Sequence, residues 1–351
     1  MVGVRPRYTA AMVALSILLG SVTLSAQTNP DHLPPGITPQ TMAAIERGLA
    51  YLARNQDGSG VWSNRGRYGA YPVAMTSLAG LALLMDGNTT TQGRYAPHVD
   101  RAARFLLQSL RPNGLIAREQ QESRPMYGHG FAMLFLGQLY GMTEEPARAE
   151  EIHDLLTQAV ALTGKAQTEA GGWYYTPNSQ NDEGSVTITQ VQALRSCRNA
   201  GLGVPKNVID KAMNYLAESQ NTDGGIRYSL RQPRGNSRPA ITAAAACCWF
   251  NAGEYDNPRA KRAVDFCKRS VLPRGSQGGH DYYAHFYWAQ ALYISRDPFW
   301  ATYFPKRRDY LLSQQLPSGG WQGDGVGDVY GTAIALVILQ LPFNQLPIMQ
   351  P

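Results

Sequence analysis

The stretch Ala170-Gly171-Gly172-Trp173-Tyr174-Tyr175 recurs in altered form along almost the whole sequence of 351 residues. The other copies are Asp57-Gly58-Ser59-Gly60-Val61-Trp62, Asn113-Gly114-Leu115-Ile116, Asp223-Gly224-Gly225-Ile226, Ser276-Gln277-Gly278-Gly279 and Ser318-Gly319-Gly320-Trp321. A Gln often stands shortly before the glycines, and the copies follow one another at intervals of 54, 58, 53, 54 and 41 residues. Such an interval holds about two helices of ordinary length with their connections. The sequence therefore predicts an array of six helix pairs.

An amphipathic helix is predicted before each glycine turn. In the first repeat, Ile45, Leu49 and Leu52 recur at helical spacing, with charged residues elsewhere on the wheel. A proline suits the first position of a helix, because the N–H that it lacks would have no partner there. The six helices are predicted to begin at Pro39, Pro97, Pro146, Pro205, Pro258 and Pro305.

The segments after the glycine turns have a different composition. They are apolar or small almost all the way round, which indicates helices buried on every side. These segments are residues 73–84, 127–140, 186–194, 241–250, 282–294 and 329–341. Helices with one apolar face alternate with helices that are apolar all round, which predicts an outer and an inner concentric layer. Closure into a ring removes the exposed ends of an open array. The sequence predicts an all-α fold, an α/α toroid of six helical hairpins in one domain over residues 39–342, followed by a tail at 343–351.

The first 26 residues have the pattern of a secretory signal peptide. Arg5 and Arg7 precede an apolar run at 10–20, and small residues up to position 26 offer a cleavage site. The run is shorter than the about 20 apolar residues of a membrane-spanning helix. We therefore expect an exported protein with no membrane span after cleavage; an uncleaved anchor is the alternative. Residues 27–38 are expected to form a Pro-rich leader.

The distribution of basic residues excludes one class of partner, and the number of cysteines bears on disulfide bonds. The basic residues behind the net charge of +6 are scattered and accompany no nucleic-acid-binding motif, so no nucleic-acid partner is expected. The four cysteines, Cys197, Cys247, Cys248 and Cys267, are interpreted as buried free thiols. A bridge from Cys197 to Cys247 or Cys248 is the alternative.

The repeated Gln, Gly-Gly and Trp before a helix rich in small residues resemble the prenyltransferase and squalene oxidase repeat. That family builds the α/α barrels of terpenoid cyclases and protein prenyltransferases, and the similarity covers residues 39–342. The resemblance implies the toroid fold and marks this chain as a divergent member.

In such a barrel, the connection into each inner helix and the first turn of that helix face one mouth of the central cavity. The polar residues at these places are His129, Asp182, Glu183, His280, Asp281, Tyr282, Tyr283, His285, Asp324, Asp328 and Tyr330, beside the aromatic residues Trp173, Tyr174, Tyr175 and Trp321. The predicted catalytic set is Asp281, Tyr283, His285 and Asp328. The predicted ligand-binding set is His129, Trp173, Tyr174, Asp182, Tyr282, Trp321 and Tyr330.

Asp281 and His285 stand four residues apart on one helix face, so the carboxylate can orient the imidazole for acid–base chemistry. The structural alternative is an Asp stabilised by the helix dipole and a His packed among aromatic residues. Asp328 likewise suits a helix N-cap.

The zinc site of protein prenyltransferases is not expected. Where the family resemblance places the Cys and His ligands, this chain has Tyr283 and Gly331. The resemblance therefore implies no metal and no cofactor. The Asp-x-Asp-Asp run of the squalene–hopene type cyclases is also absent from the sequence.

These observations predict an exported toroid that binds a small hydrophobic or glycan ligand in its central cavity, with catalysis left open. Two enzyme classes remain, a terpenoid cyclase-like enzyme and a polysaccharide lyase or hydrolase. The non-enzyme alternative is a binding scaffold in the cell envelope.

Overall fold

A computed structural model of the chain describes residues 33–63, 66, 68–118 and 120–351. The predicted signal peptide at 1–26 and the first half of the predicted leader, residues 27–32, lie outside the described residues. Residues 34–351 form a single structural unit.

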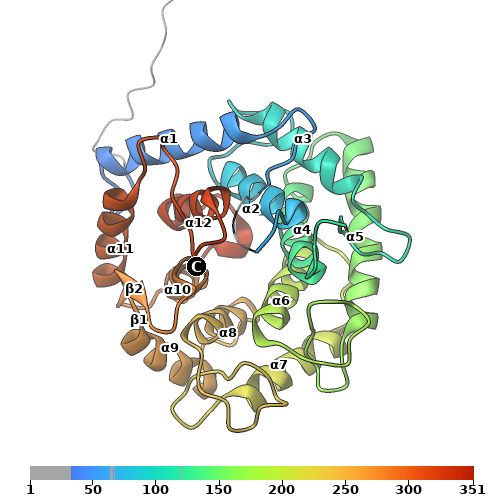
Figure 1. The fold of residues 1–351 in the computed structure, drawn as a ribbon, viewed down its shortest axis with the longest axis vertical. Coiled ribbons are helices and arrows are strands. Elements are labelled where there is room, and N and C mark those ends of the chain that lie inside the picture. Colours follow the sequence, from blue (N-terminus) through green and yellow to red (C-terminus); the bar gives the residue numbers. More distant parts are fainter. Residues whose placement is uncertain (1–32, 64–65, 67, 119) are drawn as a thin grey trace, which may run out of the picture. The chain divides into compact units, whose positions relative to one another are not determined.

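Twelve helices alternate between two layers of this unit, as Figure 1 shows. The outer helices are α1 (Pro39–Asn55), α3 (Ala96–Leu107), α5 (Pro146–Ala166), α7 (Lys206–Ser219), α9 (Pro258–Ser270) and α11 (Trp300–Gln314). The inner helices are α2 (Pro72–Met85), α4 (Pro125–Tyr140), α6 (Gly184–Asn199), α8 (Pro239–Asn251), α10 (Asp281–Ile294) and α12 (Asp328–Gln340). Each inner helix packs against the next, and α12 packs against α2. The predicted α/α toroid of six hairpins is confirmed.

The two layers differ in burial as the hydrophobic pattern predicts. Every residue of α2 is buried, because neighbouring inner helices, the outer layer and the lumen surround it. Outer helix α1 buries one stripe, which includes Ile45, Leu49 and Leu52, and exposes the opposite face. Cys197, Cys247, Cys248 and Cys267 are all buried with free thiols.

The Gln before the glycine turn links neighbouring repeats. It caps the C-terminus of its outer helix, and its side-chain amide donates both to the Gly carbonyl four residues later and to a carbonyl of the next outer helix. These pairs of acceptors are Gly60 and His98 for Gln56, Gly171 and Val208 for Gln167, Gly224 and Arg259 for Gln220, and Gly319 and Ala44 for Gln315. The pair made by Gln315 joins α11 to α1 and closes the ring.

The glycine of the turn is required by close packing. Gly171 has φ of 91°, and a Cβ atom there would lie 2.3 Å from the carbonyl oxygen of Lys211 in the next outer helix. The following tryptophans are fully buried between the layers. Their indole N–H groups donate to outer-helix carbonyls, Trp62 to Leu52 at 2.8 Å, Trp173 to Thr163 at 2.8 Å and Trp321 to Leu311 at 2.7 Å.

One predicted helix start is wrong. Five of the six prolines lie at or next to the start of an outer helix, but Pro305 lies inside α11. This helix begins earlier, at Trp300, because the Asp297 carboxylate accepts a hydrogen bond of 2.8 Å from the Phe299 N–H and starts the turn.

The fifth repeat also departs from the others. The C-cap of its outer helix α9 is Val271 instead of a Gln, and this residue begins a short antiparallel hairpin of β1 (Val271–Leu272) and β2 (Gly275–Ser276). Gln277 therefore does not occupy the place that Gln56, Gln167 and Gln220 take.

The tail covers one end of the ring. The 3-10 helices η2 (Leu341–Phe343) and η3 (Pro347–Met349) pack against inner helices, and the C-terminus lies near the centre of the ring in Figure 1. The Ile348 N–H donates to the Gln138 side chain near the C-terminal end of α4 at 3.3 Å, and the Tyr293 hydroxyl, near that end of α10, donates to Asn344 at 2.9 Å. The tail thus lies at the C-terminal ends of the inner helices. Of the helices described, none combines the length and apolar character needed to cross a membrane.

Candidate functional site

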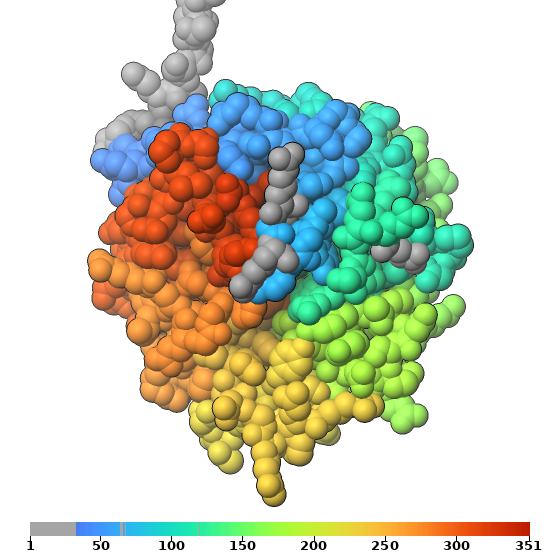
Figure 2. Space-filling model, viewed as in Figure 1, coloured from blue at the N-terminus to red at the C-terminus, as the bar shows by residue number. Residues whose placement is uncertain are grey.

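A cavity of about 420 Å³ lies at the opposite end, where the inner helices begin. Figure 2 looks onto this face of the toroid. Tyrosines from several repeats line the cavity, and they are Tyr68, Tyr71, Tyr127, Tyr175, Tyr228, Tyr283 and Tyr330. The apolar wall includes Met75, Leu78, Phe131 and Ile241. The lining therefore combines aromatic faces, hydroxyl groups and aliphatic side chains.

The residue immediately before an inner helix sits at this mouth. The six N-cap residues are Tyr71, Arg124, Glu183, Arg238, His280 and Gly327, and all except Gly327 line the cavity. Ser, Thr, Asp and Asn are the usual helix N-caps because their side chains accept backbone hydrogen bonds. Of these six residues, only Glu183 caps its helix with a side-chain hydrogen bond. The side chains of the others are therefore available for contact with a ligand in the cavity.

Glu183 supplies the sole carboxyl group among the described cavity-lining residues. It is 1% exposed and accepts hydrogen bonds from the Val186 N–H at 2.8 Å and the Ser185 hydroxyl at 2.7 Å. Burial raises the pKa of Glu183, and these hydrogen bonds offset only part of the shift. The carboxyl group is therefore held toward its neutral form, which can donate a hydrogen bond.

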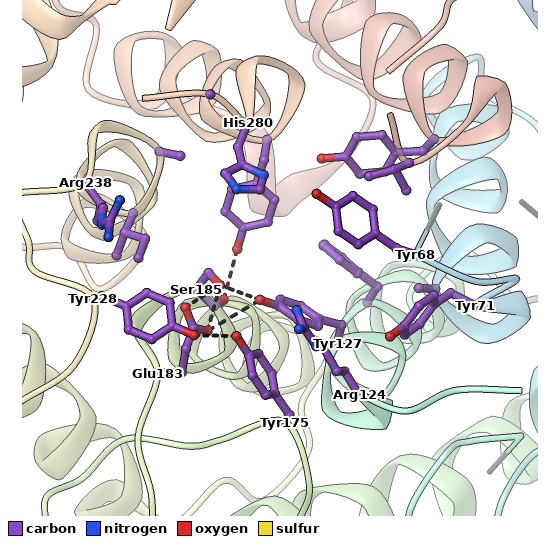
Figure 3. A pocket seen from close by; sticks show the side chains of 18 of the residues that line it. Tyr68, Tyr71, Arg124, Tyr127, Tyr175, Glu183, Ser185, Tyr228, Arg238 and His280 are labelled. Carbon is purple, nitrogen blue, oxygen red and sulfur yellow. Dashed lines mark hydrogen bonds between the residues drawn. The ribbon is translucent and has the colours of Figure 1, made fainter. Parts of the chain in front are cut away.

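A hydrogen-bonded group of hydroxyls surrounds this carboxyl, as Figure 3 shows. The Tyr127 hydroxyl lies 2.5 Å from the Ser185 hydroxyl, and the Tyr283 hydroxyl donates to the Ser185 carbonyl at 2.9 Å. Tyr175 and Tyr228 are hydrogen-bonded through their hydroxyls. Burial raises the pKa of Tyr127 and of Tyr283 well above the ordinary value, so both phenols stay neutral.

Three basic side chains stand at the rim. Arg124, Arg238 and His280 line the cavity and are exposed at its edge (Figure 3). The Arg124 guanidinium carbon lies 4.3 Å from the ring centre of Tyr175, a cation–π contact that fixes its direction. Positive charge at the start of a helix opposes the helix dipole, so these positions are electrostatically unfavourable without an anion.

The structure brings two of the predicted site residues to this cavity. Tyr283 and Tyr330 line it, as do Tyr175, Glu183 and His280, which the sequence also places at the mouth. The other nine predicted site residues do not line the cavity, contrary to the expected position at the mouth. They are Asp281, His285, Asp328, His129, Trp173, Tyr174, Asp182, Tyr282 and Trp321.

Asp281 and His285 do meet, but between α10 and α11. The His285 ring is fully buried, its Nε2 lies 3.3 Å from Asp281, and its Nδ1 lies 2.7 Å from the Tyr303 hydroxyl. Arg307 donates to Asp281 at 2.9 Å, and its guanidinium lies 5.7 Å from the Tyr282 ring. This cluster joins the inner and outer layers.

The pKa values of this cluster follow from the same contacts. Burial, followed by the charge of Arg307, lowers the pKa of His285 to about 4. Burial alone would raise the pKa of Asp281, but the hydrogen bond to His285 and the charge of Arg307 outweigh it and hold the pKa well below its usual range. The result is a neutral imidazole beside an ion pair of Asp281 and Arg307.

His129 occupies a position that has the same structural role in several repeats. The Trp173 N–H donates to the Thr187 hydroxyl at 3.0 Å, and Thr76, Thr242 and Thr332 accept the same kind of bond in three other repeats. His129 takes this place in the second repeat, because its Nδ1 accepts from the Ile116 N–H at 3.1 Å. His285 is at the matching point of α10. This position faces the outer layer, which is why neither imidazole reaches the cavity.

The remaining predicted residues are held by other contacts. The Asp182 carboxylate accepts from the Tyr215 hydroxyl at 2.7 Å and the Leu230 N–H at 2.8 Å, so it turns away while the next residue, Glu183, faces the cavity. The Tyr174 ring packs against Tyr175 at a tilt of 42°, with ring centres 4.5 Å apart. Asp328 is the first residue of α12, where Gly327 holds the N-cap position.

Sequence reasoning missed Tyr71, Arg124 and Arg238. Each stands two or three residues before a predicted inner helix and directly before the observed one, so position was the available signal. Within the described residues, no three His, Cys, Asp or Glu side chains gather in a way that could hold a metal ion.

No family model matches the chain. The drimenyl diphosphate synthase of Streptomyces showdoensis is 26% identical over 202 residues, which are 58% of this chain and 34% of that protein. The chain thus spans 34% of the length of this curated relative.

Solved structures share the fold. A variant of the type II terpene cyclase MstE from Scytonema, in complex with geranylgeranyl dihydroxybenzoate as substrate, is 15% identical with a TM-score of 0.57, over 87% of this chain and 98% of that chain. The GH76 α-mannanase of Bacteroides thetaiotaomicron is 9% identical with a TM-score of 0.62, over 86% of this chain and 94% of that chain. With its six repeats and its closed ring, the chain shares the α/α-toroid fold of these solved structures, and its sequence is similar to that of drimenyl diphosphate synthase over 202 residues.

Proposed function

We propose that this chain is an exported toroid that binds a small molecule with a hydrophobic, prenyl-like body in the tyrosine-lined cavity. The observation that carries the proposal is the cavity itself, which opens at the N-terminal ends of the inner helices while the tail covers the other end. Its volume of about 420 Å³ falls within the range of about 300–1,000 Å³ that is usual for small-molecule sites.

The apolar wall suits the body of such a ligand. Leu78, Phe131 and Ile241 come from three different inner helices and line the cavity with the faces of the tyrosines. Burial of apolar ligand surface contributes roughly 25 cal/mol per Å² before the entropy lost on binding is subtracted. The MstE complex supports this assignment, since the substrate named for that protein carries a geranylgeranyl chain.

The mouth suits the polar end of the ligand. Arg124, Arg238 and His280 supply positive charge or hydrogen-bond donors, and Glu183, whose pKa is raised by burial, lines the same cavity. The name of the curated relative contains a diphosphate, and the MstE substrate is a benzoate, so both names describe prenyl-derived molecules with an acidic end. We place the hydrocarbon inward and the polar or anionic end at the rim.

A glycoside hydrolase is less well supported. The usual mechanism needs a pair of carboxyl groups that flank the scissile bond. Among the described lining residues, Glu183 is the sole one with a carboxyl group, so no such pair is present in the cavity. The likeness to the mannanase at 9% identity concerns the fold.

Export rests on the pattern of Arg5, Arg7 and the apolar run that follows. Mass spectrometry of protein purified from its native host should find a mature start near Ala26 or Gln27. An intact Met1 in the soluble cytoplasmic fraction would contradict export.

Binding is tested by calorimetric titration with farnesol and with farnesyl diphosphate. We expect saturable binding, lost in Ala74→Phe, because Ala74 lines the cavity and a phenyl group there fills it. The matched control is Ala301→Phe, which makes the same change on the exposed side of α11. Equal affinities in the two variants, or no binding of either probe by the unmodified protein, would refute the proposal.

A further inference from the structure

The connection between α9 and α10, residues 271–280, is built differently from the others. In the first, third, fourth and sixth repeats, a Gln side chain ties the connection to the next outer helix. The fifth connection has the β1–β2 hairpin in place of this anchor. The second connection also has no such Gln contact among its described residues, but its glycine stays packed, because a Cβ atom on Gly114 would lie 2.6 Å from the carbonyl oxygen of Gln158 in α5.

Its glycines are not packed against the outer layer. A Cβ atom on Gly279 would meet nothing within 4 Å, and one on Gly278 would meet only a Pro239 side-chain atom at 3.9 Å. In contrast, a Cβ atom on Gly171 or Gly319 would lie 2.3 or 2.6 Å from an outer-helix carbonyl oxygen. The fifth turn has thus moved away from the contact that defines the other turns.

The turn faces the cavity instead. Gln277, Gly278, Gly279 and His280 are exposed, and all four line the cavity. In Figure 3 the His280 side chain stands at the rim across from Tyr175 and Tyr228. Departure from the repeat and exposure to the cavity therefore coincide in one segment.

The two polar side chains of this turn have unused hydrogen-bonding capacity. The Gln277 backbone is held, since its N–H donates to the Ser270 carbonyl at 3.0 Å. Its side-chain amide, which can donate and accept, makes no hydrogen bond with any described residue, and the same holds for the His280 ring. A fixed backbone with an unengaged amide at a cavity rim is an arrangement suited to contact with a ligand.

We propose that Gln277 and His280 contact the bound molecule directly and select it by its polar end. This inference rests on the proposed function, because it names the residues that discriminate between ligands of that cavity. It assigns to the fifth repeat a role that Gln220, in the fourth repeat, does not have.

The test compares two Gln→Ala variants for melting temperature and for affinity toward farnesyl diphosphate and farnesol. Gln277→Ala should keep the melting temperature and weaken farnesyl diphosphate binding about three- to tenfold, as expected for one lost hydrogen bond. Farnesol binding should change less. Gln220→Ala, which removes the bonds to Gly224 and Arg259, should lower the melting temperature and leave both affinities unchanged.

His280→Asn gives a second arm. His280 has φ of 53°, a left-handed conformation that Asn tolerates, so the backbone is kept while the ring is removed. Its affinity for farnesyl diphosphate should fall relative to farnesol. If the unmodified protein binds both probes and neither variant changes the ratio of affinities, this inference is wrong and the proposed function stands. If the unmodified protein binds neither probe, the proposed function fails, and this inference fails with it.

Discussion

The side-chain amide of Gln315 donates a hydrogen bond of 2.9 Å to the carbonyl oxygen of Ala44, across 271 residues of sequence. The same contact joins neighbouring outer helices at Gln56, Gln167 and Gln220. A repeat contact made between the last and the first repeat turns an open array into a ring. The ring provides the walls of the cavity, so its closure is a condition for the site.

Gln315→Leu should destabilise the fold. The substitution removes the hydrogen bonds to the carbonyls of Ala44 and Gly319, and each such bond contributes about 0.5–1.5 kcal/mol to stability. Thermal unfolding should show a lower midpoint. The matched control is Gln314→Leu, because the exposed Gln314 side chain bonds only to Ser313. Equal midpoints for the two variants would contradict the role given to this contact.

His129→Thr should change the response to acid. Burial lowers the pKa of His129 to about 4, whereas an unfolded His titrates near 6.5. Stability that depends on the neutral ring is therefore lost as the pH falls from about 6.5 to about 4, by on the order of 3 kcal/mol. Thr, the residue of four other repeats, does not titrate.

At pH 7.5 the His129→Thr variant should be less stable, because the smaller side chain leaves a void. Denaturant unfolding should show that the difference in free energy of unfolding between the unmodified protein and the variant decreases as the pH falls toward 4. His153→Thr, which makes the same change on an exposed part of α5, is the matched control. A gap of constant size would mean that His129 does not titrate in this way.

Glu122 predicts the opposite dependence. This buried carboxyl accepts from the Val73 N–H at 2.9 Å and the Arg118 N–H at 3.0 Å, and burial raises its pKa to about 7. The folded state therefore binds the proton more tightly than the unfolded state, and stability falls as the pH rises from about 4.5 to about 7.

Glu122→Gln removes this titration. The stability of the unmodified protein minus that of the variant should decrease between pH 5 and pH 7 and then level off. Glu169→Gln, at an exposed position, serves as control and should give a flat difference. An increase of the difference with pH would show that the carboxylate form is the favoured one.

Glu183→Gln should remove a pH dependence of binding. Burial raises the pKa of Glu183, so its carboxyl group loses its proton at a higher pH than an exposed Glu does. The negative charge formed there then repels an anionic ligand. Farnesyl diphosphate should bind the unmodified protein more weakly as the pH rises, relative to Glu183→Gln. The comparison of the two proteins cancels the titration of the ligand, and parallel pH profiles would show that Glu183 does not change charge.

The fold was largely readable from the sequence because the recurring Gln, Gly and Trp residues have the same structural task in each repeat that contains them. The site was not, for a physical reason. An inner helix is buried all round, so its pattern does not reveal which face meets the lumen and which meets the outer layer. His129 and His285 fall on the second kind of face, and Tyr283 and Tyr330 on the first. Asp182 and Glu183 differ by one position and face opposite ways.

A crystal structure of the protein with farnesyl diphosphate, at a concentration shown to saturate it in solution, tests most directly whether the tyrosine-lined cavity holds the ligand. We expect the hydrocarbon against Leu78, Phe131 and Ile241, with the diphosphate at the rim beside Arg124 or Arg238. A ligand bound elsewhere on the toroid, with only ordered water in the cavity, would contradict it.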